Sequence, residues 1–337
     1  MSKLVALVAS AAIALAGVAL DRVDPHPAVT MVQTATMTTT TTTTGTTTAT
    51  TATPWRPFAA TSPFNVPVVG APAIDPNSAA MVARVSRAGL GYANLVEFGI
   101  PVYEATPSTP RYQVGCTVTD WGPCPFAGSP RPIPTDARPS VGSDGAMVVI
   151  DRTAGTIDEY WQAHRSGSGW ATSWGATNVL AGSGWGGGST GAGASRLAGV
   201  VRVAEMQAGV IPHALVLQSD TVCATTVRPP ALKTDGDSTR SDCIPEGARL
   251  QLDPTIDVAA IPGITPGEAA VARALQVYGA YLIDRGGASL SVSFEVAPDA
   301  GAAGPGSVYS RAGFGWDYYG MPNVPWSQLR VLQAWNR

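Results

Sequence analysis

The chain begins with an apolar segment, residues 4–20, which leads into a threonine-rich tract that ends at Pro54. The apolar segment has the length of a signal-peptide core and falls short of the roughly 20 residues that span a bilayer. Ala14-Leu15-Ala16 supplies the small residues that a signal peptidase accepts. We therefore predict that residues 1–20 are a signal peptide, or an N-terminal membrane anchor if they are not cleaved. The protein should be secreted or displayed on the cell surface.

The threonine tract sets the start of the folded body. It contains an unbroken run of threonines, residues 38–44. Threonine is β-branched and forms helices poorly, and residues 38–54 contain no large apolar residues to bury. Residues 21–54 are therefore predicted to be a disordered stalk, and residues 55–337 a single globular domain.

The charge of the chain is low and balanced. The formal net charge at pH 7 is −3, and charged residues make up 13% of the sequence. Such a chain lacks the basic patch that binding to nucleic acid or to an anionic membrane requires. We expect a monomer with no nucleic-acid partner and no membrane contact beyond the N-terminal segment.

Four cysteines occur in the predicted exported body. An even number in such a chain indicates disulfide bonds. We predict two local pairs, Cys116–Cys124 and Cys223–Cys243. Neither pair has C-x-x-C spacing and no histidine is close in sequence, so no zinc site is expected.

Hydrophobic alternation in the body predicts mostly strands. Residues 147–150 and 156–163 form the clearest hairpin, residues 211–218 a buried strand, and residues 289–296 a strand with one wet face.

One long helix is predicted over residues 265–284. Thr265 and Glu268 form a capping box, and Pro266 occupies the first helical position. The predicted fold class is mainly β (α+β): an antiparallel β-sandwich or jelly-roll-like body with one long packed helix and a few short helices.

The second strand of the predicted hairpin carries the first candidate site. Glu159 and Trp161 share one face, and such a pair suits sugar chemistry, because the ring stacks on a pyranose while the acid transfers a proton. Tyr160, Gln162 and His164 share the opposite face and could equally bind substrate. Alternation separates the two faces without showing which one lines a cleft. A buried tryptophan with an ion-paired glutamate is the simpler interpretation.

His213 starts the predicted strand 211–218. A core histidine bonded to backbone groups is the simpler interpretation, and a general acid or base at the mouth of a cleft is the functional one. We predict Glu159 and His213 as the proton-transferring pair, with Asp235 as a further acid. Trp185 and Tyr281 are predicted as additional substrate-binding aromatic residues.

Asp235-Gly236-Asp237 lies between the second pair of cysteines. Most sequences of this kind form turns, and a calcium ion held by Asp235 and Asp237 is the alternative. No cofactor is expected apart from this calcium.

The glycine-rich residues 182–193 match two motifs. Gly186-x-Gly188-x-x-Gly191 imitates a dinucleotide fingerprint but lacks the strand and helix that this motif needs. Gly187-Gly188-Ser189-Thr190-Gly191 imitates a nucleophile elbow. A serine hydrolase that uses Ser189 and His213 is therefore a minor alternative.

Several short strings of the body are considered together: Glu159-Tyr160-Trp161-Gln162-Ala163, Ile211-Pro212-His213-Ala214-Leu215, Gly247-Ala248-Arg249-Leu250-Gln251-Leu252, Tyr278-Gly279-Ala280-Tyr281-Leu282-Ile283-Asp284 and Pro325-Trp326-Ser327-Gln328-Leu329-Arg330. As a set they resemble a group of secreted actinobacterial proteins of unassigned activity. The resemblance implies export and one body over most of residues 60–335, and it carries over no catalytic residues.

These features together predict a secreted carbohydrate-active enzyme, a polysaccharide hydrolase or lyase. It would act on a polysaccharide or cell-wall glycan through a carboxylate–histidine pair and aromatic stacking. A non-catalytic glycan- or cell-wall-binding module is the alternative.

Overall fold

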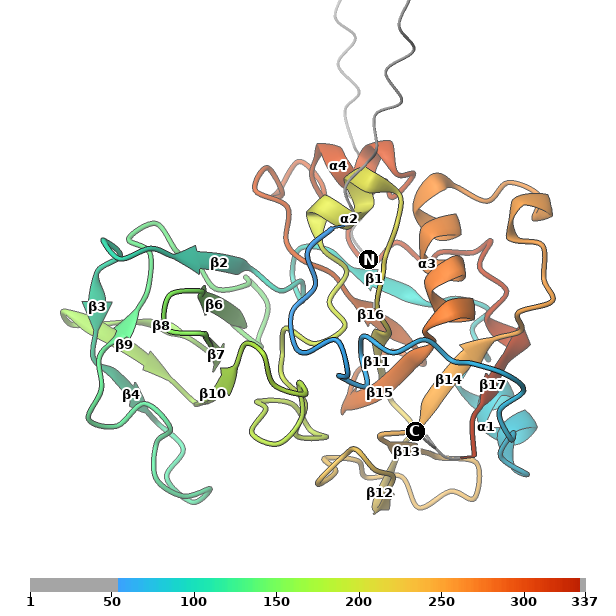
Figure 1. The fold of residues 1–337 in the computed structure, drawn as a ribbon, viewed down its shortest axis with the longest axis horizontal. Helices are drawn as coiled ribbons and strands as arrows, with labels where there is room; N and C mark the ends of the chain where they lie inside the picture. Colours follow the sequence, from blue (N-terminus) through green and yellow to red (C-terminus); the bar gives the residue numbers. More distant parts are fainter. Residues whose placement is uncertain (1–53, 334–337) are drawn as a thin grey trace, which may run out of the picture. The chain divides into compact units, whose positions relative to one another are not determined.

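The computed structural model describes residues 54–333, whose strands form two main sheets and several short ones (Figure 1). The described residues belong to one unit of contacts, Thr50–Arg337. The predicted signal peptide and all but the last residue of the predicted stalk lie outside the described residues. Among the helices that are described, none is long and apolar enough to cross a membrane.

The larger sheet has six strands. In spatial order they are β1 (Tyr92–Asn94), β16 (Ser291–Ser293), β11 (Leu215–Ser219), β15 (Ala280–Arg285), β14 (Arg249–Leu252) and β17 (Leu329–Val331). β1 pairs with β16 and β11 with β15 in parallel, while β14 is antiparallel to both of its neighbours. The sheet is thus mixed. The prediction of a mainly β protein with a few helices is confirmed, whereas an antiparallel sandwich or jelly roll is not.

The smaller main sheet contains the predicted hairpin. Its order is β10 (Trp174–Val179), β7 (Thr156–Trp161), β6 (Met147–Asp151) and β2 (Val102–Ala105). β6 and β7 are antiparallel, as the alternation predicted.

The remaining strands form three short sheets. They are β4 (Val114–Cys116) with β9 (Gly169–Thr172) and β8 (His164–Ser166), β3 (Arg111–Tyr112) with β5 (Arg131–Pro132), and β12 (Val222–Val227) with β13 (Ile244–Glu246).

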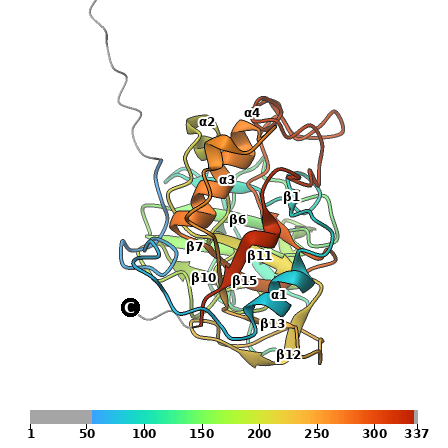
Figure 2. The same cartoon turned by 90° about the vertical axis from the view of Figure 1, so that its right-hand side faces the viewer.

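The helices are short except for one. They are α1 (Ser78–Val85), α2 (Val203–Ala208), α3 (Pro266–Val277) and α4 (Ser307–Arg311), with 3-10 turns η1 (Val258–Ala260) and η2 (Trp326–Gln328). α3 begins with the predicted capping box, in which Thr265 and Glu268 bond reciprocally. It contacts β14 and covers one face of the larger sheet (Figure 2).

The predicted helix 265–284 is wrong in its last part. α3 ends at Val277, Gly279 adopts a φ of 68°, and the chain continues directly as β15. A Cβ on Gly279 would lie 2.5 Å from the carbonyl oxygen of Leu250, so only glycine allows this close turn. The apolar residues that follow are buried on both sides, and a buried strand of this kind cannot be told from a helix by periodicity alone.

β15 is buried between two cores. Ala280 and Leu282 pack in the core under α3, whereas Tyr281 and Ile283 pack in a second core together with Val148 of β6. Because the second core takes side chains from both main sheets, it holds β15 beside the smaller sheet. This packing brings residues from the end of β15 close to the loops of the hairpin.

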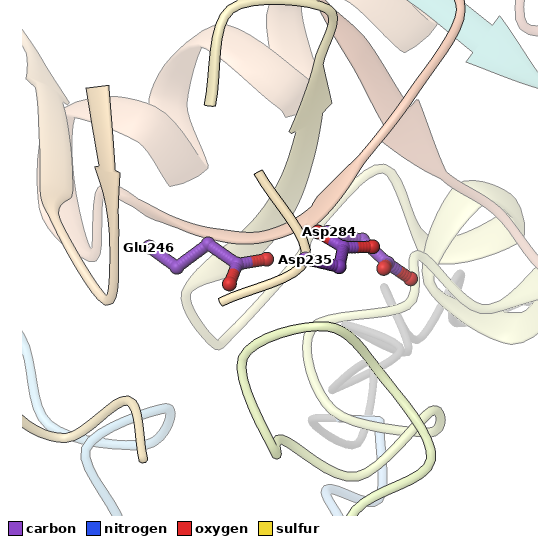
Figure 3. Close-up of side chains that lie close together, drawn as sticks. All are labelled: Asp235, Glu246 and Asp284. Carbon is purple, nitrogen blue, oxygen red and sulfur yellow. The ribbon is translucent and has the colours of Figure 1, made fainter. Parts of the chain in front are cut away.

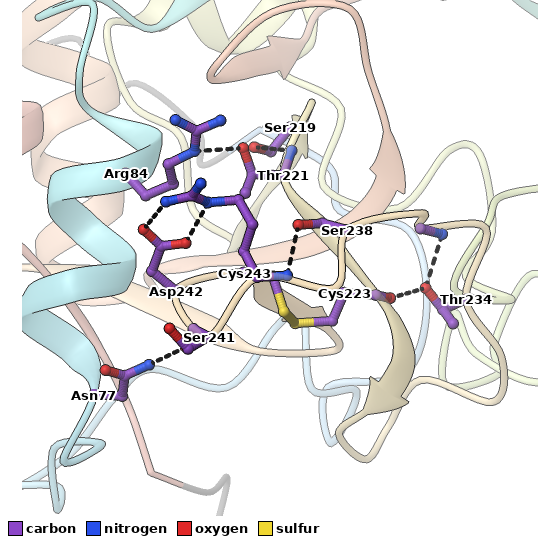
Figure 4. The surroundings of a disulfide bond; sticks show 12 residues. Asn77, Arg84, Ser219, Thr221, Cys223, Thr234, Ser238, Ser241, Asp242 and Cys243 are labelled. Atoms are coloured by element: carbon purple, nitrogen blue, oxygen red, sulfur yellow. Dashed lines mark hydrogen bonds and ion pairs between the residues drawn. A yellow bond between two sulfur atoms is a disulfide. The ribbon is translucent and has the colours of Figure 1, made fainter.

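The two predicted disulfides are present. The Cα atoms are 5.4 Å apart in Cys116–Cys124 and 5.0 Å apart in Cys223–Cys243. Figure 4 shows that the hydroxyl of Thr234 donates to the carbonyl oxygen of Cys223, at 3.0 Å, which ties the loop after β12 to the second bond. Two disulfides indicate an oxidising, extracytoplasmic environment.

Candidate active site

Three carboxyl groups from separate parts of the chain converge beside the glycine-rich loop (Figure 3). Asp235 lies in the loop closed by the second disulfide, Glu246 ends β13, and Asp284 lies near the end of β15. One carboxyl oxygen from each lies within 4.8 Å of the others. Figure 3 shows the Glu246 side chain pointing towards Asp235 and Asp284. These three residues are the carboxylate cluster.

An irregularity in β15 positions Asp284. The register with β11 shifts so that Ile283 is an extra residue, and Asp284 follows it directly. A bulge of this kind bends the strand and re-aims the next side chain, and bulges are frequent beside active sites. The backbone N–H of Gly191 then donates to Oδ1 of Asp284 at 2.9 Å.

Burial keeps protons on part of the carboxylate cluster. Glu246 is fully buried, and neither of its carboxyl oxygens has a hydrogen bond of normal geometry. Its burial, together with the charges of Asp235 and Asp284, raises the pKa of Glu246 to about 9. Burial also raises the pKa of Asp284 to about 7; Arg196 opposes this shift and the nearby Asp235 reinforces it. The cluster therefore holds protons near neutral pH.

Asp235 is the exposed member of the carboxylate cluster. The backbone N–H of Arg285 donates to its Oδ1 at 3.0 Å. The buried Glu246 carboxyl, with its high pKa, thus lies beside the solvent-exposed Asp235 carboxyl. Two neighbouring carboxyl groups in such different environments can serve as a proton donor and a proton acceptor.

Two cavities meet at the carboxylate cluster. Their volumes are about 550 Å³ and about 720 Å³. Both are lined by Asp144, Arg196, Asp284 and Arg285, so they are two halves of one groove with Asp284 at the junction.

Tryptophans line the half with the smaller volume. Trp121 stacks on Trp161 with ring centres 6.0 Å apart, and meets Trp174 edge-on at 5.7 Å. The indole N–H of Trp161 donates to Oδ1 of Asp144 at 3.3 Å. Trp121 is 59% exposed, and it lies in the loop closed by Cys116–Cys124. This half therefore offers a stacking surface held by a disulfide.

Two basic side chains, Arg196 and Lys233, line the same cavity as Asp235 and Asp284. Arg196 is buried, and its guanidinium donates to the hydroxyl of Ser189 at 3.2 Å and to the Ser189 carbonyl at 2.7 Å. The Lys233 ammonium donates to the carbonyl oxygen of Thr190 at 3.0 Å. Both cations thus bind the glycine-rich loop that forms one wall of the groove.

Glu159, one of the predicted proton-transferring pair, lines neither cavity. It is fully buried and accepts hydrogen bonds from the hydroxyls of Ser189, at 3.0 Å, and Ser195. Burial raises the pKa of Glu159, while the backbone of Arg196 and the two serines counteract it. The Glu159 carboxyl group thus holds the glycine-rich loop in place through Ser189.

His213, the other member of that pair, also lines neither cavity. Nδ1 lies 2.9 Å from the carbonyl oxygen of Ala214, and Nε2 lies 3.0 Å from the Glu205 carboxyl. Burial alone would lower the pKa of His213, but the charge and hydrogen bond of Glu205 outweigh it, so this pKa is raised. Glu159 and His213 thus bond to different partners. The minor alternative paired Ser189 with His213, but the Ser189 hydroxyl donates to Glu159.

The other predicted binding residues are divided between core and surface. Tyr160 is buried beside Phe126, and Tyr281 and Trp185 form an edge-to-face pair in the second core. Gln162 accepts a hydrogen bond from Ser173, and His164 is exposed. Of the predicted side chains, Trp161, Asp235 and Ser189, the nucleophile of the minor alternative, line the groove.

The predicted calcium ligands Asp235 and Asp237 contact different groups: Asp235 belongs to the carboxylate cluster, and Asp237 does not. Asp237 forms an ion pair with Arg285 at 2.7 Å, outside the carboxylate cluster. Among the described residues, the group whose spacing could hold a metal ion is the carboxylate cluster itself.

Sequence reasoning missed Asp284 and Arg196, which line the groove, and Glu246, which lies buried beside Asp235 and Asp284. The predicted helix 265–284 ends at Asp284, whereas the structure places this residue in β15. Glu246 ends a strand of three residues, and Arg196 lies in irregular chain, so neither carries a local pattern. One feature of the sequence could have indicated Asp284: it is an acidic residue that directly follows the apolar run Ala280–Ile283. If this run forms a strand, its last residues lie at the end of the sheet.

Comparisons of the chain with protein-family models, with curated proteins and with solved structures each found no significant match. Its function is therefore inferred from the geometry of the groove and the chemistry of its side chains.

Proposed function

We propose that this protein is a secreted carbohydrate-active enzyme that cleaves a polysaccharide or cell-wall glycan, with Asp284 as the proton donor. One observation carries the proposal: a carboxyl group with a pKa of about 7 lies at the middle of a groove whose wall bears three tryptophans. A general acid works best when its pKa is close to the working pH. Stacked tryptophans bind the faces of sugar rings.

The reaction starts at the glycosidic oxygen. Asp284 donates its proton to this oxygen, the bond to the sugar carbon breaks, and the leaving sugar keeps the bonding electrons and the proton. In hydrolysis a water molecule adds to the anomeric carbon, and its surplus proton passes to a carboxylate. Asp235, exposed and adjacent, is the candidate acceptor. In a lyase, a base instead removes a proton from the ring carbon next to the one that bears the glycosidic oxygen. A carbon–carbon double bond forms between these two carbons as the carbon–oxygen bond breaks, and the oxygen leaves with the proton from Asp284.

Glu246 acts through its neighbours. Its pKa of about 9 keeps it protonated at neutral pH, so it adds no negative charge beside Asp235 and Asp284. It is a positioning residue, because it is fully buried and reaches the groove only through the other two carboxyl groups.

Glu159 and His213 remain a predicted acid–base pair that awaits a test. The contacts favour Asp284, because Asp284 lines both cavities whereas Glu159 and His213 line neither.

A non-catalytic glycan-binding module is the second candidate. The exposed Trp121, stacked on Trp161, favours it, because a binding platform needs aromatic rings and no acid. The two candidates differ in whether Asp284 matters for bond cleavage.

The test is turnover of a polysaccharide panel by the wild type and by Asp284→Asn. The panel contains peptidoglycan, chitin, cellulose, xylan, arabinogalactan and pectin, and the readouts are new reducing ends and ultraviolet absorbance of unsaturated products. Loss of the acid should lower turnover by roughly 100-fold or more. Asp136→Asn, an exposed aspartate outside both cavities, is the matched control. Binding without turnover by the wild type would support the binding module and overturn the enzyme.

A further inference from the structure

The proton donor of the proposed reaction lies between two cavities and not at the end of one. Asp144, Arg196, Asp284 and Arg285 line both cavities, so the two cavities adjoin at Asp284. A site that removes terminal sugars needs a barrier on one side of its acid. Here Asp284 lines a cavity of about 550 Å³ and a second one of about 720 Å³.

The two halves differ in chemistry. The tryptophan half contains Trp121, Trp161 and Trp174, of which Trp121 extends furthest into solvent. The polar half lies over β11 and β16. Its lining includes the polar Asn94, Gln218, Ser291 and Ser293, together with Tyr92, Phe98, Ile100 and Tyr318.

The polar half is an ordered hydrogen-bonding surface. Gln218 donates from Nε2 to the hydroxyl of Ser293 at 2.8 Å, and Ser291 donates to Oε1 of Gln218 at 3.0 Å. The amide thus connects two serines of the neighbouring strand. Side chains fixed in this way can bond sugar hydroxyls at a low cost in conformational entropy. The sequence predicted a wet face for this strand, but Ser291 and Ser293 are only 6% and 7% exposed, and they line the floor of this cavity.

We propose that the groove binds a glycan polymer that extends past Asp284 on both sides, so that the protein cleaves internal bonds. One arm of the polymer stacks on Trp121 and its neighbours, and the other arm is hydrogen-bonded by the Gln218 ladder. This inference rests on the proposed function and adds the substrate class, a long chain in place of a terminal sugar. The covalent step is unchanged.

The experiment uses reducing-end-labelled hexasaccharides of β-1,4-linked glucose and of β-1,4-linked N-acetylglucosamine, and glycan strands released from peptidoglycan. Internal cleavage predicts labelled products of intermediate length at the earliest times. Release of single sugars or dimers from one end only would overturn the inference and leave the proposed function standing. Absence of cleavage with every probe, together with absence of binding, would count against both.

A second measurement separates the two arms. The affinity of the Asp284→Asn variant for oligosaccharides should rise with their length, from trimer to hexamer. Trp121→Ala should lower hexamer affinity by roughly tenfold. Trp316→Ala is its matched control, because Trp316 is similarly exposed at 61% and lines neither cavity.

The polar arm is tested with Gln218→Ala, for which Gln207→Ala at an exposed position outside both cavities is the control. Loss of affinity for the hexamer but not for the trimer, in one of the two arm variants, supports a polymer that spans both halves. Equal affinity for trimer and hexamer in Asp284→Asn would overturn it.

Discussion

Gly191 donates its backbone N–H to Oδ1 of Asp284 at 2.9 Å and leaves no side chain in the carboxylate cluster. A Cβ at this position would lie 2.5 Å from Cγ of Asp235 and 2.6 Å from Oε1 of Glu246. The glycine therefore lets the loop approach all three carboxyl groups, which is the close backbone approach that only glycine permits.

Gly191→Ala should disrupt the carboxylate cluster. The added methyl group overlaps the Asp235 carboxyl, and overpacking of this kind costs about 1–3 kcal/mol of unfolding free energy. The melting temperature and the rate of glycan turnover should both decrease. Gly187→Ala, where a Cβ would meet only Oδ1 of Asn178 at 3.6 Å, is the control and should change neither. A stable, fully active Gly191→Ala would contradict this account of the loop.

Activity should depend on pH through Asp284. Its pKa is raised to about 7, so the protonated form that can donate predominates below this value. The acidic group loses its proton as the pH rises, and kcat/KM should fall by about tenfold per pH unit above 7. A pH profile of kcat/KM measures this effect. A flat profile between pH 6 and about 9 would exclude Asp284 as the acid.

Stability should depend on pH through Glu246. Its native pKa of about 9 exceeds the ordinary 4.5, so the folded state holds this proton more tightly than the unfolded chain does. The contribution to stability is complete below pH 4.5 and is lost as the pH rises towards 9. Glu246→Gln removes this titrating group, so the melting temperature of the variant should change less with pH between these limits. A steeper dependence in the variant would refute the assignment.

His213 should matter for folding more than for chemistry. Its raised pKa reflects the buried Glu205 partner, so the pair stabilises the fold most at low pH and less as the pH rises through the native pKa of the histidine. His213→Ala leaves a buried carboxylate without its partner, and should cost about 3–5 kcal/mol of unfolding free energy. Denaturant unfolding measures this cost.

The exposed His164 provides the control for this prediction, since His164→Ala should leave stability unchanged. If His213→Ala unfolds like the wild type and loses roughly 100-fold in turnover, the histidine is catalytic after all.

Metal removal should leave activity unchanged. The proposed role of the carboxylate cluster is to hold protons, and the Lys233 ammonium lies on the same wall of the groove. Dialysis against EDTA should not lower turnover, and excess calcium chloride should not raise the melting temperature. Loss of activity with EDTA that calcium restores would identify the cluster as a metal site.

Local patterns determined several parts of this protein. The capping box at Thr265 and Glu268 bonds reciprocally as predicted, the hairpin of β6 and β7 pairs as predicted, and both disulfides join neighbouring cysteines. Each of these depends on residues close together in the chain, where capping geometry, alternation and short loop closure act within one segment.

Tertiary packing decided which carboxyl groups meet at the candidate site. Residues 280–284 continue the apolar stripe of α3, and whether they extend the helix or form a strand depends on partners: β11 and β14 pair with them after Gly279 turns the chain. The same pairing creates the bulge that aims Asp284 at the groove, where Asp235 and Glu246 arrive from segments distant in sequence. Their pKa values arise from mutual charge and burial, which exist only once the sheets have packed.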